Sequence, residues 1–191
     1  MKKIPTLFVR ESRHPFHVIA RVNLICDWVL QGHGVATEKL DGTACLWHDG
    51  KLWKRRSLGK GGTAPADFIE ADFDDTTGKR FGWIPVGAGP EDAAARQALT
   101  FKQFPMCEGQ TYELIGPSIQ GNPYEAFQPS LFRHGGETLF IPATMMTFAG
   151  LREWLAEWSP IEGIVWHHAD GRMAKLKRRD FGLPWPVRKT Q

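Results

Sequence analysis

The chain has 191 residues, 42% of them hydrophobic, which is long enough for one domain with a substantial core. No apolar run approaches the roughly 20 residues that cross a bilayer, so we expect neither a membrane span nor a secretory leader. The net charge of +3 is small, but its cations gather at residues 51–60 and 172–191. Such clusters are often only solvated faces; here they are also compatible with polyphosphate or nucleic acid. Three cysteines without CxxC spacing favour a reducing, cytoplasmic environment.

Strands dominate the predicted elements. We expect them at residues 6–9, 35–39, 43–47, 52–55, 110–115, 163–168 and 173–177. The pairs Asp49-Gly50 and Asp170-Gly171 predict two-residue hairpin loops within this series. Residues 58–88 are rich in glycine and acids, and predict a long loop.

Two helices complete the prediction. Residues 90–104 begin with a proline, carry acids in the first turn and stop before Pro105. A second helix is predicted after Thr147, a suitable N-cap, and before Pro160. Its apolar residues recur at helical spacing: Phe148, Leu151, Trp154, Leu155 and Trp158. The chain is therefore predicted to be a single α+β domain over residues 1–191, dominated by antiparallel strands.

One lysine stands out at the end of a predicted strand. Lys39 lies two residues before the pair Asp41-Gly42. Glycine permits a sharp bend at a strand end, and such a bend would present the Lys39 amine to a pocket. A solvated lysine beside an ordinary turn is the alternative.

The last predicted hairpin adds two further lysines. If Asp170-Gly171 is the loop, Trp166 faces Lys175 and Ile164 faces Lys177. Because side chains alternate along strands, one face then carries Glu162, Ile164, Trp166, Lys175 and Lys177. A carboxylate, two amines and apolar surface on one face suit a flat base with a phosphate, a combination that a purely structural sheet rarely needs.

Five segments in this order resemble the motifs of the covalent nucleotidyltransferases, the superfamily of ATP-dependent polynucleotide ligases and capping enzymes. They are residues 38–43 around the nucleophilic lysine, 54–56, 112–117, 162–165 and 175–177. The resemblance implies an antiparallel-sheet-rich adenylyltransferase domain of the ATP-grasp-like ligase catalytic type, with flanking helices.

Finer features are similar to RNA ligases. Residues 113–123 resemble phage-type RNA ligases and a small ligase family shared by bacteria and vertebrates, and residues 175–186 resemble the latter family. Ala44 occupies a position where DNA ligases usually carry arginine, and the chain ends soon after residue 177, without the C-terminal oligonucleotide-binding (OB-fold) domain. We therefore expect an RNA ligase without an OB-fold.

The resemblance implies a reaction through a covalent lysyl-AMP. Lys39 would attack the α-phosphorus of ATP, AMP would pass to an RNA 5′-phosphate, and a 3′-hydroxyl would complete the bond. The ordinary lysine pKa of about 10.4 would have to fall through burial and nearby positive charge. Lys175 and Lys177 would hold the α-phosphate, and Glu162 would orient water bound to Mg²⁺ or Mn²⁺.

The remaining motif residues would bind the nucleoside and the 5′-end. Glu113 would accept a hydrogen bond from a ribose hydroxyl, and the main chain of Glu38 would contact adenine. Phe132 is the candidate for stacking on the base. Arg55, with Arg56 as the alternative, would contact the ribose or the incoming 5′-phosphate. Asp41 would shape the nucleophile turn.

Basic residues beside the motifs are the candidates for RNA contact: Lys54, Arg56, Arg178 and Arg179. A protein partner is a further candidate source of RNA-binding surface. Two kinds of alternative stay open. One is another enzyme of the same superfamily, either a minimal ATP-dependent DNA ligase or a capping-type guanylyltransferase. The other is a non-catalytic nucleotide- or RNA-binding module, which would not need the nucleophilic lysine.

Overall fold

The computed structural model describes residues 2–14, 16–157 and 161–186. The chain forms two compact units. Unit 1 contains Asp41–His134 and the N-terminal residues up to Lys3, and unit 2 contains Ile4–Leu40 and Gly135–Gln191. The chain passes from one unit to the other between Lys3 and Ile4, between Leu40 and Asp41, and between His134 and Gly135. The assignment of residues 1–191 to one nucleotidyltransferase domain stays a prediction.

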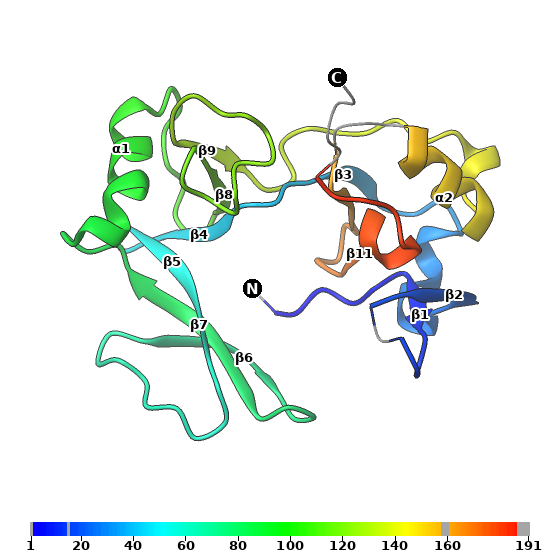
Figure 1. Cartoon of the computed structure of the whole chain (residues 1–191), viewed down its shortest axis with the longest axis horizontal. Coiled ribbons are helices and arrows are strands. Elements are labelled where there is room, and N and C mark those ends of the chain that lie inside the picture. Colours follow the sequence, from blue (N-terminus) through cyan, green and yellow to red (C-terminus); the bar gives the residue numbers. More distant parts are fainter. Residues whose placement is uncertain (1, 15, 158–160, 187–191) are drawn as a thin grey trace. The chain divides into compact units, whose positions relative to one another are not determined.

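Unit 1 is built on a six-stranded antiparallel sheet in the order β6-β7-β5-β4-β8-β9 (Figure 1). Its strands are β4 (Thr43–His48), β5 (Lys51–Leu58), β6 (Ile69–Asp74), β7 (Lys79–Pro85), β8 (Thr111–Ile115) and β9 (Ser130–Arg133). The antiparallel pairing predicted for β4 and β5 is confirmed, with Trp47 opposite Leu52.

The Asp49-Gly50 hairpin loop is confirmed as well. Both residues have positive φ, 51° and 65°, as a tight turn of the I′ type requires. The long loop predicted over residues 58–88 is wrong, because β6 and β7 form a hairpin there. The acids that argued against strands, such as Asp72 and Asp74, lie on the edge strand β6, where charged side chains are tolerated.

A helix covers part of this sheet. The 3₁₀ turn η2 (Pro90–Asp92) leads into α1 (Ala93–Phe101), close to the helix predicted from Pro90. Ala95 and Ala98 of α1 are buried in one apolar cluster with Leu131 of β9 and Tyr112 of β8. Small residues on α1 therefore allow the helix to lie close to the sheet.

Unit 2 contains a three-stranded antiparallel sheet, in the order β11-β10-β3, and a two-stranded one, β1-β2. The elements are β1 (Phe8–Arg10), β2 (Val18–Val22), η1 (Leu24–Val29), β3 (Val35–Lys39), η3 (Ala143–Met145), α2 (Phe148–Glu157), β10 (Gly163–His167), β11 (Met173–Lys177) and η4 (Arg178–Phe181). Strand β3 has the bounds predicted from the sequence.

Helix α2 packs into the core of unit 2 as its periodicity predicts. Leu151, Trp154 and Leu155 are buried, and the Thr147 hydroxyl accepts a hydrogen bond from the Gly150 N–H at 3.0 Å, which confirms the N-cap. Trp158 and Pro160 lie outside the described residues.

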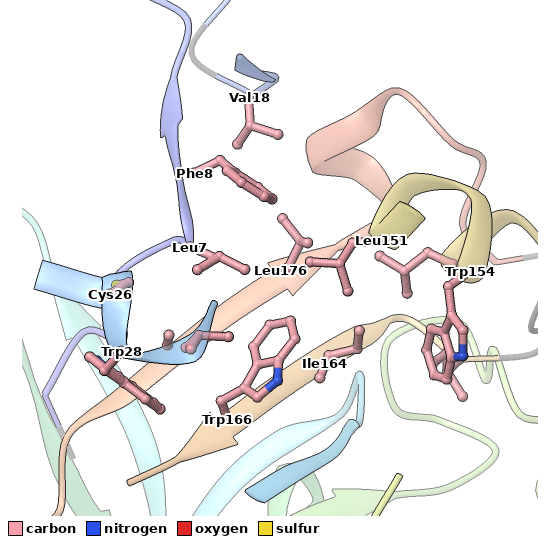
Figure 2. Packing of buried hydrophobic residues seen from close by; sticks show 14 residues of the cluster. Leu7, Phe8, Val18, Cys26, Trp28, Leu151, Trp154, Ile164, Trp166 and Leu176 are labelled. Atoms are coloured by element: carbon pink, nitrogen blue, oxygen red, sulfur yellow. The ribbon is translucent and has the colours of Figure 1, made fainter. Parts of the chain in front are cut away.

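The apolar core of unit 2 lies on one face of β10 and β11. Figure 2 shows Ile164, Trp166 and Leu176 in one cluster with side chains such as Leu7 and Leu151. Ile164 and Leu176 are directly opposite each other in the two strands, and both are completely buried. Since side chains alternate, Lys175 and Lys177 project from the opposite face.

This arrangement corrects the predicted hairpin. Val165, not Trp166, lies opposite Lys175, and Gly163, not Ile164, lies opposite Lys177. His168 and Arg172 close the hairpin through the His168 N–H and the Arg172 carbonyl at 2.9 Å, so three residues form the loop instead of two. A shift of one residue exchanges the faces, so Ile164 and Trp166 do not share a face with the lysines.

Among the described residues, none of the helices has both the length and the apolar character to cross a bilayer. The cytoplasmic location stays a prediction.

Gly163 has little room for a side chain. A Cβ at this position would collide with the Leu176 carbonyl oxygen and lie 2.8 Å from the Lys177 Cα. We expect Gly163→Ala to lower the free energy of unfolding by roughly 1–3 kcal/mol, as overpacking does. Urea denaturation would measure this, with Gly59→Ala as the control because a Cβ there meets nothing within 4 Å. Equal stabilities of the two variants would contradict the steric argument.

Candidate active site

A buried carboxylate in unit 2 holds two of the predicted lysines. Glu162 is only 1% exposed, and its two oxygens bind Lys39 Nζ at 2.6 Å and Lys177 Nζ at 2.9 Å. Lys39, Gly163 and Lys177 lie side by side on β3, β10 and β11. Because Gly163 has no side chain, none stands between the two lysines in this row. The structure thus brings together three residues from distant parts of the sequence.

The chain beyond Lys177 is fixed by a second buried carboxylate. Asp180 is 2% exposed; one oxygen accepts the Lys177 N–H at 2.8 Å, and the other pairs with the Arg10 guanidinium at 2.9 Å. Neither Asp180 nor Arg10 was singled out by sequence reasoning. The available signal was local, since an acid three residues after a strand end often caps the turn that follows.

Lys175 lies on the same face as Lys39 and Lys177. The pKa of Lys175 is lowered to about 8, first by burial and then by the positive charges of Lys177, Lys39 and Arg10, against the opposing effect of Asp180. Lys175 thus titrates closer to neutral pH than an ordinary lysine does.

Glu38 precedes Lys39 on β3. Burial raises the pKa of its carboxyl group, and the negative charge of Glu137 adds to the rise. The direction of its main-chain groups follows from Ala36, two residues earlier on β3. The Ala36 carbonyl accepts the Leu139 N–H at 2.8 Å, on the edge of β3 away from β10. Since alternate residues of a strand point the same way, the polar main-chain groups of Glu38 also face this edge.

Unit 1 presents a second set of predicted residues on β8 and β9. Glu113 is 8% exposed, and one of its oxygens accepts the Gly42 N–H at 2.9 Å. Phe132 is directly opposite Glu113 on β9 and is 43% exposed, so an open aromatic ring lies beside the carboxylate on one face of the sheet. Ala44 lies opposite Glu113 on the neighbouring strand β4, and its small side chain leaves room beside the carboxylate.

The loop between β8 and β9 holds the main chain that follows Lys39. The Tyr124 hydroxyl accepts the Asp41 N–H at 2.7 Å, and the Gln120 amide donates to the Gly42 carbonyl at 3.4 Å. Gln120, Asn122 and Glu125 all have positive φ, which is unusual for residues other than glycine. Backbone strain of this kind gathers at functional sites. Tyr124 was missed from the sequence, where only the turn-rich composition of this loop was visible.

Arg55 stacks within unit 1. Its guanidinium lies 5.4 Å and 5.3 Å from the ring centroids of Phe81 and Trp83. Burial lowers the pKa of Arg55, against the effect of Asp72. Its neighbour Arg56 is exposed. The two arginines therefore differ in environment, the first braced by aromatic rings and the second open to solvent.

The sequence model of a family described as RNA ligase 1 matches residues 91–191, more than half of the chain. The chain belongs to the RNA ligase 1 family. The matched segment includes Glu113, Glu162, Lys175 and Lys177.

Curated relatives agree with this family. The chain is 27% identical to RNA ligase 1 of Mus musculus over 99% of its own length and 83% of the relative. The figures for RNA ligase 1 of Rattus norvegicus are the same. A shorter match to RNA ligase 1 of Danio rerio is 38% identical over 42% of this chain and 27% of the relative.

The basic residues expected to contact RNA fall into two groups in this member of the RNA ligase 1 family. Arg56 and Arg179 are exposed. Lys54 instead forms an ion pair with Asp92, a carboxylate only 3% exposed.

Arg178, the remaining candidate for RNA contact, is buried, and its contact with RNA stays a prediction. Arg178 is 3% exposed, and its guanidinium donates to the main-chain carbonyls of Leu155 and of Pro184, the latter at 2.9 Å. The basic composition of residues 172–191 did not reveal that this side chain of η4 is buried.

The pKa of Lys175 has a consequence for the stability of this RNA ligase 1 family member. Between pH 8 and 10.5 the unfolded chain binds more protons than the folded chain, so the free energy of unfolding should rise with pH across this window. In Lys175→Met this contribution is absent, so the rise should be smaller. Urea unfolding at several pH values would measure it, with the exposed Lys60→Met as the control. The same pH dependence in wild type and Lys175→Met would contradict the assignment.

Proposed function

We propose that this protein is an ATP-dependent RNA ligase that joins a 5′-phosphate to a 3′-hydroxyl through a covalent lysyl-AMP on Lys39. The observation that carries the proposal is the meeting of Lys39 and Lys177 on the buried carboxylate of Glu162. Membership of the RNA ligase 1 family supports RNA as the substrate.

In the first step the Lys39 amine attacks the α-phosphorus of ATP. A bond forms between Lys39 Nζ and phosphorus, while the bond from phosphorus to the bridging oxygen of pyrophosphate breaks. Attack requires a neutral amine, and Glu162, 2.6 Å from Nζ, is within reach to accept its proton. Lys177 and Lys175 neutralise the charge that develops on the phosphate oxygens.

A hydrated magnesium ion at this face would be held mainly by the phosphates of ATP. Within the described residues no group of three or more His, Cys, Asp or Glu side chains could hold a metal ion. Magnesium at nucleotide sites is commonly bound by one or two carboxylates, phosphates and water, and Glu162 would orient its bound water here. When bound, the ion would supply further positive charge at the α-phosphate.

Recognition of the nucleoside is assigned to Glu113, Phe132 and the main chain of Glu38. Glu113 would accept from a ribose hydroxyl, and the exposed ring of Phe132 beside it would stack on adenine. The outward-facing main chain of Glu38 would bind the base edge.

The later steps transfer AMP to the RNA 5′-phosphate and then release it as the 3′-hydroxyl attacks that phosphorus. Arg55, braced by two aromatic rings, is the candidate for the 5′-phosphate. Arg56 and Arg179 are the exposed candidates for contacts along the RNA backbone. Selection of RNA over DNA would come from contacts to 2′-hydroxyls in the wide, shallow groove of the A-form helix.

A sealing assay on matched ends tests this function. Wild type with ATP and Mg²⁺ should join all-RNA strands, and both Lys39→Ala and Lys39→Arg should abolish joining, because guanidinium stays protonated and cannot attack. Lys102→Ala, at an exposed lysine outside both basic clusters, is the matched control and should join normally.

Three outcomes would overturn the proposal. Equal rates on all-DNA strands would favour a minimal DNA ligase, and transfer of GMP instead of AMP would favour a guanylyltransferase. Nucleotide binding without covalent transfer would favour a binding module.

A further inference from the structure

The carboxylate of Glu113 has a second partner besides the Gly42 N–H. Its other oxygen lies 2.6 Å from His134 Nε2, and His134 Nδ1 lies 2.9 Å from the Thr111 hydroxyl. The His134 N–H also donates to the Thr111 carbonyl at 3.1 Å, which extends the β8-β9 pairing by one residue. His134 is therefore held by both its main chain and its ring.

Elementary hydrogen-bond chemistry fixes the proton on this ring. An ionised carboxylate can only accept, so His134 Nε2 carries a proton and donates to Glu113. In the neutral ring Nδ1 then accepts from the Thr111 hydroxyl; in the charged ring it donates to that oxygen. Either way, Thr111 sets the ring orientation and His134 directs its Nε2 proton at Glu113.

Both carboxylate oxygens of Glu113 thus accept hydrogen bonds from donors whose positions are fixed by the fold. The last torsion of a glutamate side chain is otherwise broad, with little intrinsic preference. Two fixed donors define the plane of the carboxylate, and each oxygen keeps a lone pair for a further donor. A ribose hydroxyl that approaches Glu113 therefore meets an acceptor of set direction.

We infer that His134 is a positioning residue that sets ribose selectivity through Glu113. The inference rests on the proposed function, in which Glu113 accepts from a ribose hydroxyl. With the His134 donor removed, only the Gly42 N–H would orient the carboxylate, and discrimination against nucleotides that lack the hydroxyl would fall.

Two amide variants of His134 provide the test. The amide nitrogen of His134→Gln reaches about as far as Nε2 and can still donate to Glu113, whereas the shorter side chain of His134→Asn cannot. The rate of protein adenylylation would be measured with ATP, 2′-deoxyATP and 3′-deoxyATP. The quantity compared is the ratio of kcat/KM for ATP to that for the analogue that wild type disfavours. This ratio is insensitive to the fraction of folded protein, so a general loss of structure would not alter it.

We expect the ratio to fall about tenfold or more in His134→Asn, in line with the loss of a hydrogen bond to a charged group, and to stay within about threefold of wild type in His134→Gln. His48→Gln alters the other His–Glu pair of unit 1, His48 with Glu108 at 2.7 Å, and should leave the ratio unchanged. If His134→Asn does not fold, Thr111→Val, which removes the hydroxyl bound to the ring, should lower the ratio instead.

The inference is overturned if His134→Asn keeps the wild-type ratio, if both amide variants lose it equally, or if wild type discriminates against neither analogue. A wild-type protein that takes up no adenylyl group from any of the three nucleotides would instead refute the proposed function, and the inference with it.

Discussion

The ion pairs of Glu162 are the interaction on which the candidate site depends. An ionised carboxylate that is almost wholly removed from water is costly unless it is paired and hydrogen-bonded. Glu162 meets this requirement with two lysines, one from β3 and one from β11, so the three strands of this sheet are tied at one end. Removing either amine would leave a buried charge partly unpaired, so both lysines stabilise the fold as well as forming part of the candidate site.

The apolar core determines which side chains surround this carboxylate. Ile164, Trp166 and Leu176 fill one face of β10 and β11, and this sets the register that turns Lys175 and Lys177 to the other face (Figure 2). A one-residue slip would bury two lysines and expose the core, so hydrophobic burial strongly favours the observed register. Burial lowers the pKa of Lys175, and the two neighbouring lysines on this face add to the effect.

Features of the fold that depend on neighbouring residues in the sequence were predictable. Strand β3, the Asp49-Gly50 turn and the Thr147 cap were predicted correctly, because each depends on neighbouring residues. The Asp170-Gly171 turn was not, since an Asp-Gly pair fits both two- and three-residue loops and the core decides between them. The burial of the Arg178 side chain was not predictable, because its guanidinium donates to main-chain carbonyls, those of Leu155 and Pro184. The pairing of Glu113 with His134 joins residues 21 positions apart, which no local pattern reveals.

The proposed function depends above all on adenylylation of Lys39. Intact-mass analysis after incubation with ATP and Mg²⁺, followed by peptide mapping, would detect this modification and locate it. We expect a gain of one adenylyl group, located on the peptide that contains Lys39 and absent from Lys39→Ala. An adduct on Lys175 or Lys177, or the same gain of mass in Lys39→Ala, would contradict it.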